Sequence, residues 1–195
     1  MTKLNKFIKR VFDIVMALVG LLLTGVVIAI AFIVASFETK SNGMFVQKRV
    51  GMNGKIFNVY KIKTMKNVAG TTITTSSDKR ITSSGKFFRK TKIDELPQLW
   101  NVLKGDMSFV GPRPDVPGYA DKLEGPDRII LSVRPGITGP ASIKYKNEEE
   151  ILAKVDNPEL YNIKVIYPDK VQINKEYIKQ YSLIKDLKYI IKTIL

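Results

Sequence analysis

A run of 24 residues without a charged side chain, from Ile14 to Phe37, constrains this chain more than any other part of its 195-residue sequence. By length and composition it is a membrane segment, because about 20 apolar residues span the hydrocarbon core of a bilayer. The apolar core of a cleaved signal peptide is shorter, about 7 to 15 residues, and ends at a small-residue cleavage site. The run therefore predicts a helix that is retained in the membrane.

Basic residues flank this run on both sides and favour one topology. They are Lys3, Lys6, Lys9 and Arg10 before it, and Lys40, Lys48, Arg49, Lys55, Lys61 and Lys63 after it. Positive flanks stay in the cytoplasm, so a spanning helix would leave one flank on the wrong side. A helix broken at Thr24-Gly25 gives two arms of about 18 Å each, enough to enter one leaflet and return. We expect a re-entrant helix over residues 1–40; a single-pass anchor is the alternative.

Composition limits the chemistry of the remaining chain, residues 41–195, which form one domain of ordinary size. The absence of Cys and His excludes a zinc site, a Ser-His-Asp triad and a histidine base. A base must then be a carboxylate, Lys or Tyr, and a catalytic metal is expected to be Mg²⁺ or Mn²⁺. The formal charge of +14 attracts nucleic acid, anionic lipid headgroups or phosphate-bearing substrates alike.

An adjacent pair of carboxylates, Asp94 and Glu95, opens the segment with the most candidate chemistry. Apolar residues then recur at helical spacing up to Gly105, a usual residue just past a helix end. With Asp94 as the N-cap, Pro97 falls in the first turn, where it removes no hydrogen bond. We therefore expect the helix terminus to keep Asp94 ionised, as a nucleophile or metal ligand requires.

Arginines lie on both sides of the carboxylate pair. Arg89 precedes it by five residues, and Arg113 follows a short predicted strand, Phe109–Val110, in the rigid turn Gly111-Pro112-Arg113-Pro114. Two carboxylates between two arginines suit a magnesium-bound phosphate ester. A plain helix cap at Asp94 is the alternative.

Upstream, the sequence predicts a β-hairpin and then a loop. The strands Met44–Gln47 and Ile56–Tyr60 surround Asn53-Gly54, a strong hairpin signal. Lys61 and Lys63 continue one face of the second strand, either as solvated charges or as substrate ligands. Residues 67–84 lack apolar periodicity and predict a loop that could cover the site, and residues 81–90 predict a short helix.

Downstream, residues 127–133 predict helical packing, and residues 134–139 form a second rigid turn carrying Arg134 and Thr138. This turn is either a phosphate contact or a plain loop. Residues 148–170 are polar, with Pro158 and Pro168 as expected breaks. The tail from Tyr177 to Ile194 has apolar residues at helical spacing among lysines, which fits a helix lying on a membrane or one packed on the domain.

The string from Asp94 to Pro114, joined by Lys61–Met65 upstream and Arg134–Gly139 downstream, resembles the signature of the bacterial sugar transferases, the monotopic phosphoglycosyl transferases. The resemblance covers the chain from about Lys9 onward. The family's membrane helix usually breaks at a Ser-Pro pair, and this segment has no proline. The family often has Trp after the second turn, where Pro140 stands here.

This resemblance implies a re-entrant helix at the cytoplasmic face of the bacterial inner membrane. It also implies transfer of a phosphosugar from a UDP-sugar to a polyprenyl phosphate, with UMP release and Mg²⁺ as cofactor. It places the nucleophile of a two-step covalent mechanism at Asp94.

Taken together, these patterns predict a small, mixed α/β catalytic domain with a re-entrant membrane helix and amphipathic interfacial helices. Asp94 and Glu95 are the expected catalytic residues, and Glu95 is the expected metal ligand. The expected substrate-binding residues are Arg89, Arg113, Arg134, Lys61, Lys63 and Thr138. No nucleic-acid partner is expected. Two alternatives are a membrane-anchored basic module for nucleic acid or anionic lipid, which would need no magnesium, and a polyprenyl-phosphate phosphatase.

Overall fold

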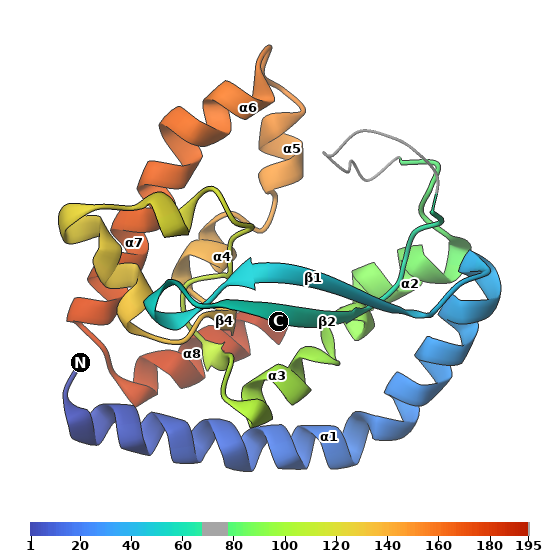
Figure 1. The fold of residues 1–195 in the computed structure, drawn as a ribbon, viewed down its shortest axis with the longest axis horizontal. Coiled ribbons are helices and arrows are strands. Elements are labelled where there is room, and N and C mark those ends of the chain that lie inside the picture. Colours follow the sequence, from blue (N-terminus) through green and yellow to red (C-terminus); the bar gives the residue numbers. More distant parts are fainter. Residues whose placement is uncertain (68–77, 195) are drawn as a thin grey trace.

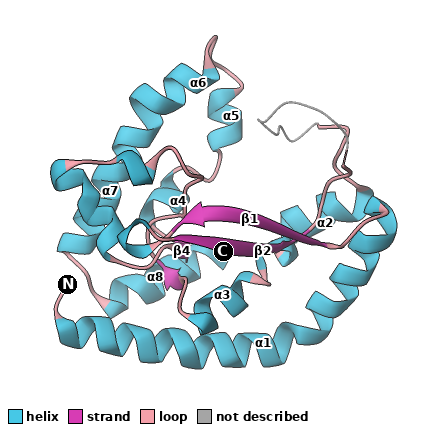
Figure 2. Cartoon of the chain, viewed as in Figure 1, coloured by secondary structure: helices cyan, strands magenta, loops and turns pink. Residues whose placement is uncertain are grey.

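A computed structural model describes residues 1–67 and 78–194. Helices surround two small sheets of two strands each, as Figures 1 and 2 show. The mixed α/β class is therefore confirmed. The predicted loop over residues 67–84 lies largely outside the described residues.

The first helix, α1 (Lys3–Thr39), is 37 residues long and continuous. It is long and apolar enough to cross a membrane by length and composition alone. The expected break at Thr24-Gly25 is wrong, because neither residue removes a backbone hydrogen bond as proline does. The Thr24 hydroxyl instead donates to the Gly20 carbonyl at 2.7 Å, within the helix. Figure 1 shows that α1 bends in its second half and follows the rest of the molecule.

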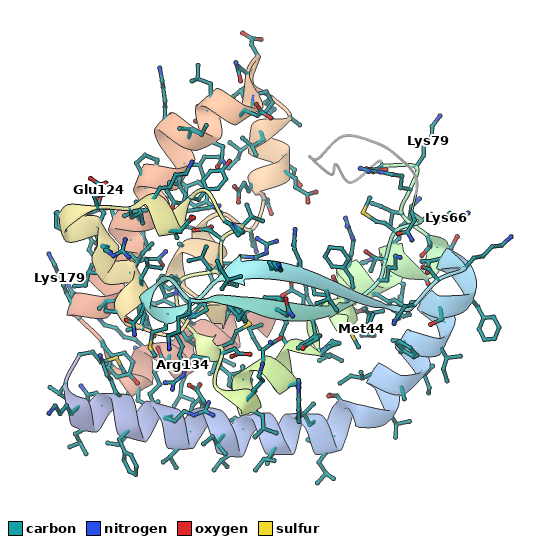
Figure 3. All side chains as sticks on the ribbon, in the orientation of Figure 1. Met44, Lys66, Lys79, Glu124, Arg134 and Lys179 are labelled. Atoms are coloured by element: carbon teal, nitrogen blue, oxygen red, sulfur yellow. The ribbon has the colours of Figure 1, made fainter. Side chains whose placement is uncertain are left out.

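One narrow stripe of α1 is buried against the protein, and the opposite face is bare. The buried positions are spaced by whole helical turns, at Asp13, Ala17, Ala31, Ala35 and Thr39. The exposed face is made of large apolar side chains, among them Leu4, Phe7, Val15, Leu22, Leu23, Val26, Ile30, Ile33 and Phe37. Figure 3 shows side chains along the outer side of α1 projecting away from the other elements.

Polar contacts hold both ends of α1 to the rest of the chain. Near its start, the Lys9 ammonium pairs with Asp186 at 2.5 Å, and both side chains are buried. Asp13 accepts hydrogen bonds from the Ser108 hydroxyl and the Phe109 amide. Near its end, Glu38 accepts a hydrogen bond from the Ser84 amide at 3.2 Å. The two ends of α1 therefore lie against the same body of protein.

The expected hairpin is confirmed, and both strands are longer than predicted. Strands β1 (Met44–Val50) and β2 (Ile56–Ile62) pair antiparallel with Met44 opposite Ile62 and Val50 opposite Ile56. The turn between them holds Asn53 at φ 58° and Gly54 at φ 77°, a conformation that Asn and Gly adopt most readily.

The segment after the hairpin corrects the expected helix cap. Helix α2 (Ser83–Thr91) confirms the helix predicted over residues 81–90 and ends at Lys92, which has φ 59°. A 3₁₀ turn, Ile93–Glu95, then leads into α3 (Gln98–Lys104), whose N-cap is Pro97 and has no side-chain capping bond. Asp94 lies inside the 3₁₀ turn and is not a cap, so the helix terminus does not hold its charge as predicted.

The two arginine turns are packed against each other. Strand β3 (Ser108–Val110) confirms the short predicted strand and pairs parallel with β4 (Gly136–Thr138). The Gly111 amide donates to the Thr138 carbonyl, and the Gly136 amide donates to the Pro112 carbonyl. A Cβ on Gly111 or Gly136 would clash with the facing backbone, so glycine permits this close approach.

The C-terminal third is helical. It contains α4 (Pro140–Lys144), α5 (Glu148–Leu152), α6 (Pro158–Tyr161), α7 (Tyr167–Lys179) and α8 (Leu183–Ile194). A π turn, residues 162–166, joins α6 to α7, so the break expected at Pro168 is wrong. The change from π to α geometry lies directly before this proline, which is the second residue of α7. The predicted 127–133 segment is a 3₁₀ stretch, Gly125–Ser132.

The predicted amphipathic tail forms the end of α7 and the whole of α8. It has features of both alternatives, a helix lying on a membrane and a helix packed on the domain. Tyr177 and Asp186 are buried against the core, whereas Ile184, Leu187 and Ile191 are exposed.

The core of the described residues forms three clusters, and α1 contributes Ala17 to one and Ala31 and Ala35 to another. The division at residue 40 remains a prediction.

We expect Asp186→Asn to destabilise the fold by about 3–5 kcal/mol, because it leaves the buried Lys9 ammonium without its counter-charge. Thermal unfolding of the purified chain in detergent measures the change. Lys170→Met is the control: its pair with Glu148 is about a quarter exposed, and its loss should cost about 1 kcal/mol or less. Equal effects of the two variants would contradict a special role for the Lys9–Asp186 pair.

Candidate functional site

Glu95 lies at the centre of a charge cluster built by three separate elements. Its Oε1 accepts hydrogen bonds from the Lys61 ammonium of β2 at 2.9 Å and from the Arg113 guanidinium at 2.7 Å. Burial would raise the pKa of Glu95, but Arg113 and Lys61 outweigh it and hold this pKa far below its usual value. The carboxylate is therefore ionised at neutral pH. Its Oε2 accepts neither of these two bonds.

Asp94, the neighbouring carboxylate, is in the opposite situation. Its Oδ1 is buried and has no hydrogen-bond partner among the described residues. Burial and the adjacent charge of Glu95 raise the pKa of Asp94, against the influence of Lys61, Lys92 and Arg89. A buried polar oxygen without a partner costs free energy, so this position is suited to contact with a ligand, an ion or a reacting group.

Arg89 approaches Asp94 from the end of α2. Its Nε donates to the Thr64 hydroxyl at 3.0 Å, and its positive charge opposes the rise in the pKa of Asp94. The structure thus brings Arg89, Asp94, Glu95, Lys61 and Arg113 together, as the sequence predicted.

Arg113 reaches Glu95 from the turn that follows β3. Its second amino group donates to the Ile137 carbonyl of β4 at 3.3 Å, so both arginine turns help to fix it. The Val50 amide at the end of β1 donates to the Asp115 carbonyl at 2.9 Å and secures the other side of the turn.

Arg49 belongs to this cluster although the sequence analysis gave it no role in the site. The hairpin register pairs Phe45 with Lys61 and Arg49 with Phe57, which places Arg49 and Lys61 on one face. The Arg49 guanidinium donates to the Pro114 carbonyl at 3.1 Å, next to Arg113. Burial and the charge of Arg113 lower the pKa of Arg49. The signal for Arg49 in the sequence was the alternation of side chains along each strand, which places Arg49 and Lys61 on the same face of the hairpin.

Three predicted substrate ligands lie elsewhere. Lys63 donates to the Ser41 hydroxyl at 2.8 Å and makes no contact with Glu95. The Arg134 Nε donates to the Gly105 carbonyl at 2.7 Å, at the end of α3 remote from Glu95, and Figure 3 shows it on the side of the sheet near α1. Thr138 is buried, and its hydroxyl lies 2.6 Å from that of Thr193 in α8.

Asn101 is a second residue near the site to which the sequence gave no role. It holds α3 against β2. It is fully buried in α3; its amide donates to the Asn58 carbonyl at 2.7 Å and accepts from the Tyr60 amide at 3.1 Å. This side chain thereby joins α3 to β2 beside Lys61. Its signal in the sequence was one polar amide among apolar helix positions.

The residues present fit a magnesium ion that arrives with a phosphate ester. Among the described residues, no group of three or more Asp, Glu, His or Cys side chains could cage a metal. Mg²⁺ commonly takes one or two carboxylates, several waters and substrate phosphates. Two carboxylate oxygens are suited to such a role: Asp94 Oδ1 has no partner within the described residues, and Glu95 Oε2 accepts neither the Lys61 nor the Arg113 bond.

The fold and the charge cluster together define a class: a small α/β protein in which two adjacent carboxylates, surrounded by cations, lie close to one long apolar helix. The sequence model of the family described as "Bacterial sugar transferase" matches residues 4–195. The chain belongs to this family.

Relatives show what the chain is similar to. It is 36% identical over 95% of its length to the "Galactosyl transferase CpsE" of Streptococcus agalactiae, of which it covers 41%. It is 35% identical over 97% of its length to the "UDP-glucose:undecaprenyl-phosphate glucose-1-phosphate transferase" of Escherichia coli, of which it covers 40%. A "Putative undecaprenyl-phosphate N-acetylgalactosaminyl 1-phosphate transferase" of Bacillus subtilis is 46% identical over 60% of this chain and 67% of that protein. The chain thus spans about two fifths of the first and second of these relatives.

Asp115 adds a titratable group behind the Arg113 turn. Burial raises the pKa of its carboxyl to about 6, against the influence of Lys170 and Arg49. The Tyr167 hydroxyl donates to it at 3.4 Å, and Glu148 is the nearby like charge. A carboxyl whose pKa is raised in the fold stabilises the fold below its unfolded pKa of about 3.9, and this contribution is lost as pH rises through 6.

We therefore expect Asp115→Asn to become more stable relative to the unmodified chain as pH rises from about 4 to about 7, by roughly 2–3 kcal/mol. Unfolding curves collected across this range give the difference. The control is Asp169→Asn, because bonds from Lys144 and Tyr145 lower the pKa of Asp169 and the pH dependence should have the opposite sign. A pH-independent difference for Asp115→Asn would contradict the raised pKa.

Proposed function

We propose that this chain transfers a phosphosugar from a UDP-sugar to a polyprenyl phosphate, releasing UMP, at the cytoplasmic face of the bacterial inner membrane. The observation that carries the proposal is the different surroundings of two adjacent carboxylates: Glu95 is paired with two cations, and Asp94 Oδ1 has no hydrogen-bond partner in the described part of the chain. The names of two relatives, which pair undecaprenyl phosphate with a sugar 1-phosphate, support the same reaction class.

Asp94 serves as the nucleophile. One of its carboxylate oxygens attacks the β-phosphorus of the UDP-sugar, and the bond from that phosphorus to the bridging oxygen breaks. UMP leaves with the electron pair, and an acyl phosphate links Asp94 to the phosphosugar. A phosphate oxygen of the polyprenyl phosphate then attacks the same phosphorus, which frees the Asp94 carboxylate and forms the lipid diphosphosugar.

The cations around Glu95 bind the anionic donor. Arg113 and Arg49 stand beside each other, and within the described part of the chain Arg49 donates hydrogen bonds to the Pro114 carbonyl and the Gln47 side-chain oxygen. Guanidinium groups match phosphate oxygens with two parallel hydrogen bonds. Lys61 and Arg89 complete a positive surrounding in which Asp94 meets a diphosphate without prohibitive repulsion.

Magnesium is the proposed cofactor, held by Glu95 together with the donor's phosphate oxygens. When bound, Mg²⁺ supplies charge that offsets the growing negative charge on the leaving phosphate. Glu95 is suited to hold it because its carboxylate is kept ionised by Lys61 and Arg113.

We further propose that α1 enters and leaves the membrane on one face. Its ends are bound to the same body through Lys9–Asp186 and Glu38–Ser84. A straight helix of this length would be about 55 Å long, enough to cross a bilayer, but a crossing would separate these two contacts by the thickness of the membrane.

The decisive measurement omits the lipid. Enzyme, Mg²⁺ and a panel of UDP-sugars are mixed without polyprenyl phosphate, and intact mass is recorded after acid quenching. We expect a phosphosugar adduct on the chain and about one UMP per enzyme, because the first step needs no acceptor. Asp94→Asn should give neither product while retaining the thermal stability of the parent.

Several outcomes would count against this scheme. UMP that appears only after lipid is added, with no adduct, would remove Asp94 as a covalent nucleophile. Release of inorganic phosphate from polyprenyl phosphate would indicate the phosphatase instead. A flat response across a broad UDP-sugar panel with lipid present would contradict the transferase.

Two matched substitutions compare the contribution of Arg113, which lies in the cluster, with that of Arg134, which lies outside it. Arg113→Lys keeps the charge but loses the two-pronged phosphate contact, so kcat/KM should fall at least tenfold, the equivalent of about 1.4 kcal/mol. Arg134→Lys lies beyond α3 and should change kcat/KM by less than about threefold. Steady-state UMP release measures both; the reverse ranking would move the phosphate site to Arg134.

A further inference from the structure

One buried polar side chain next to the Asp94 turn has no role in the proposed reaction so far. Gln98, the first residue of α3, is only 2% exposed. Its Nε2 is buried and has no hydrogen-bond partner among the described residues. Burying an amide donor without a partner costs free energy, and native proteins keep few such groups. The structural role of this glutamine therefore does not account for its presence.

Gln98 lies on the side of α3 that faces β2. Asn101, three residues further on, binds the backbone of β2 through both ends of its amide. Residues three apart on a helix are neighbours, so the side chains of Gln98 and Asn101 start from the same side of α3. Asn101 already makes the link to β2, and the Nε2 of Gln98 adds no bond to it within the described part of the chain.

Asp94 lies on the other side of Gln98 along the chain. It comes four residues earlier, and Leu96 and Pro97 between them have helical dihedral angles, so the two side chains are about one turn apart. The 3₁₀ turn that contains Asp94 also contacts β2. Burial raises the pKa of Asp94, and the charge of Lys61 in β2 opposes this rise. A buried acceptor, Asp94 Oδ1, and a buried donor, Gln98 Nε2, thus lie about one turn apart, each without a partner among the described residues.

We propose that Gln98 is a positioning residue whose side-chain amide donates a hydrogen bond to the Asp94 carboxylate oxygen that is not bonded to phosphorus. This inference rests on the two-step reaction proposed above. Neither atom is bonded to the other in this structure, so the bond forms during the reaction by rotation of the two side chains.

The two chemical steps make opposite demands on such a donor. In the first step the Asp94 carboxylate loses its negative charge as its oxygen bonds to the β-phosphorus. In the second step an oxygen of the polyprenyl phosphate bonds to this phosphorus, the bond from phosphorus to Asp94 breaks, and its electron pair returns to the carboxylate. A hydrogen bond to the second carboxylate oxygen stabilises the returning charge. Gln98 therefore assists release of the phosphosugar from Asp94 and not its capture.

Gln98→Met tests this role, because methionine has a similar length and lacks the N–H donor. Enzyme, Mg²⁺ and one equivalent of UDP-sugar form the adduct, polyprenyl phosphate is then added in detergent, and intact mass follows the adduct after rapid acid quenching. We expect the Gln98→Met adduct to decay at least about tenfold more slowly than that of the unmodified chain. UMP release before lipid is added should change by less than about threefold, so the adduct should accumulate during turnover.

Thermal unfolding gives a second, independent readout. Gln98→Met should unfold at the same or a higher temperature, because an apolar side chain replaces a buried amide donor without a described partner. Asn101→Leu is the structural comparison: it leaves the Asn58 carbonyl and the Tyr60 amide unpaired and should unfold at a lower temperature without accumulation of the adduct. Gln172→Met makes the same substitution at an exposed position of α7 and should leave decay of the adduct unchanged.

The outcomes distinguish this inference from the proposed function. If the unmodified chain forms the adduct and Gln98→Met passes it to lipid at the same rate, the role of Gln98 is overturned and the two-step reaction stands. Equal slowing of both steps together with a lower unfolding temperature would assign Gln98 a structural role and overturn the inference as well. If the unmodified chain forms no adduct with any UDP-sugar, the covalent reaction is overturned and the role of Gln98 with it.

Discussion

The longest helix has to satisfy two environments at once, because one stripe of α1 packs against the protein while its outer face presents large apolar side chains. The stripe works through small residues, Ala17, Ala31 and Ala35, which let the backbone approach closely, and through buried Asp13 near its start. Burying Asp13 is tolerable because Ser108 and Phe109 donate to it. The other elements take their positions from this contact: α3 lies against the middle of α1, and α2 lies against its second half.

That packing also decides where the chemistry lies. Ile93, the first residue of the 3₁₀ turn, packs on the cluster that contains Ala31 and Ala35, so the carboxylate pair stands almost directly on the apolar helix. Asn101 then links α3 to β2 and sets Lys61 opposite Glu95. If the proposed function holds, this position suits a reaction between a water-soluble sugar nucleotide and a membrane-bound lipid, since neither substrate has to leave its own phase.

Much of this was predictable from the sequence, because local rules act over a few residues. Asn53-Gly54 identified the hairpin, and the cluster of Arg89, Asp94, Glu95 and Arg113 followed from a short motif string. The failures have physical causes as well. Asp94 seemed a cap because Pro97 fits a first helical turn, but the chain leaves α2 through Lys92 at φ 59° and a 3₁₀ turn intervenes. The positions of Arg49, Arg134 and Thr138 depend on contacts between distant segments, which local spacing does not encode.

The two adjacent carboxylates, Asp94 and Glu95, differ in the cations that contact them. Lys61 and Arg113 make their ion pairs with Glu95, whereas Asp94 feels the charge of Lys61 without an ion pair to it. The consequence is a pair whose pKa values move apart: that of Glu95 falls, and that of Asp94 rises through burial and the charge beside it. Such divergence assigns different roles to two chemically similar groups. In the proposed reaction, the carboxylate of Glu95, held by two cations, would be a poor nucleophile, whereas the Asp94 oxygen without a described partner keeps its lone pairs available.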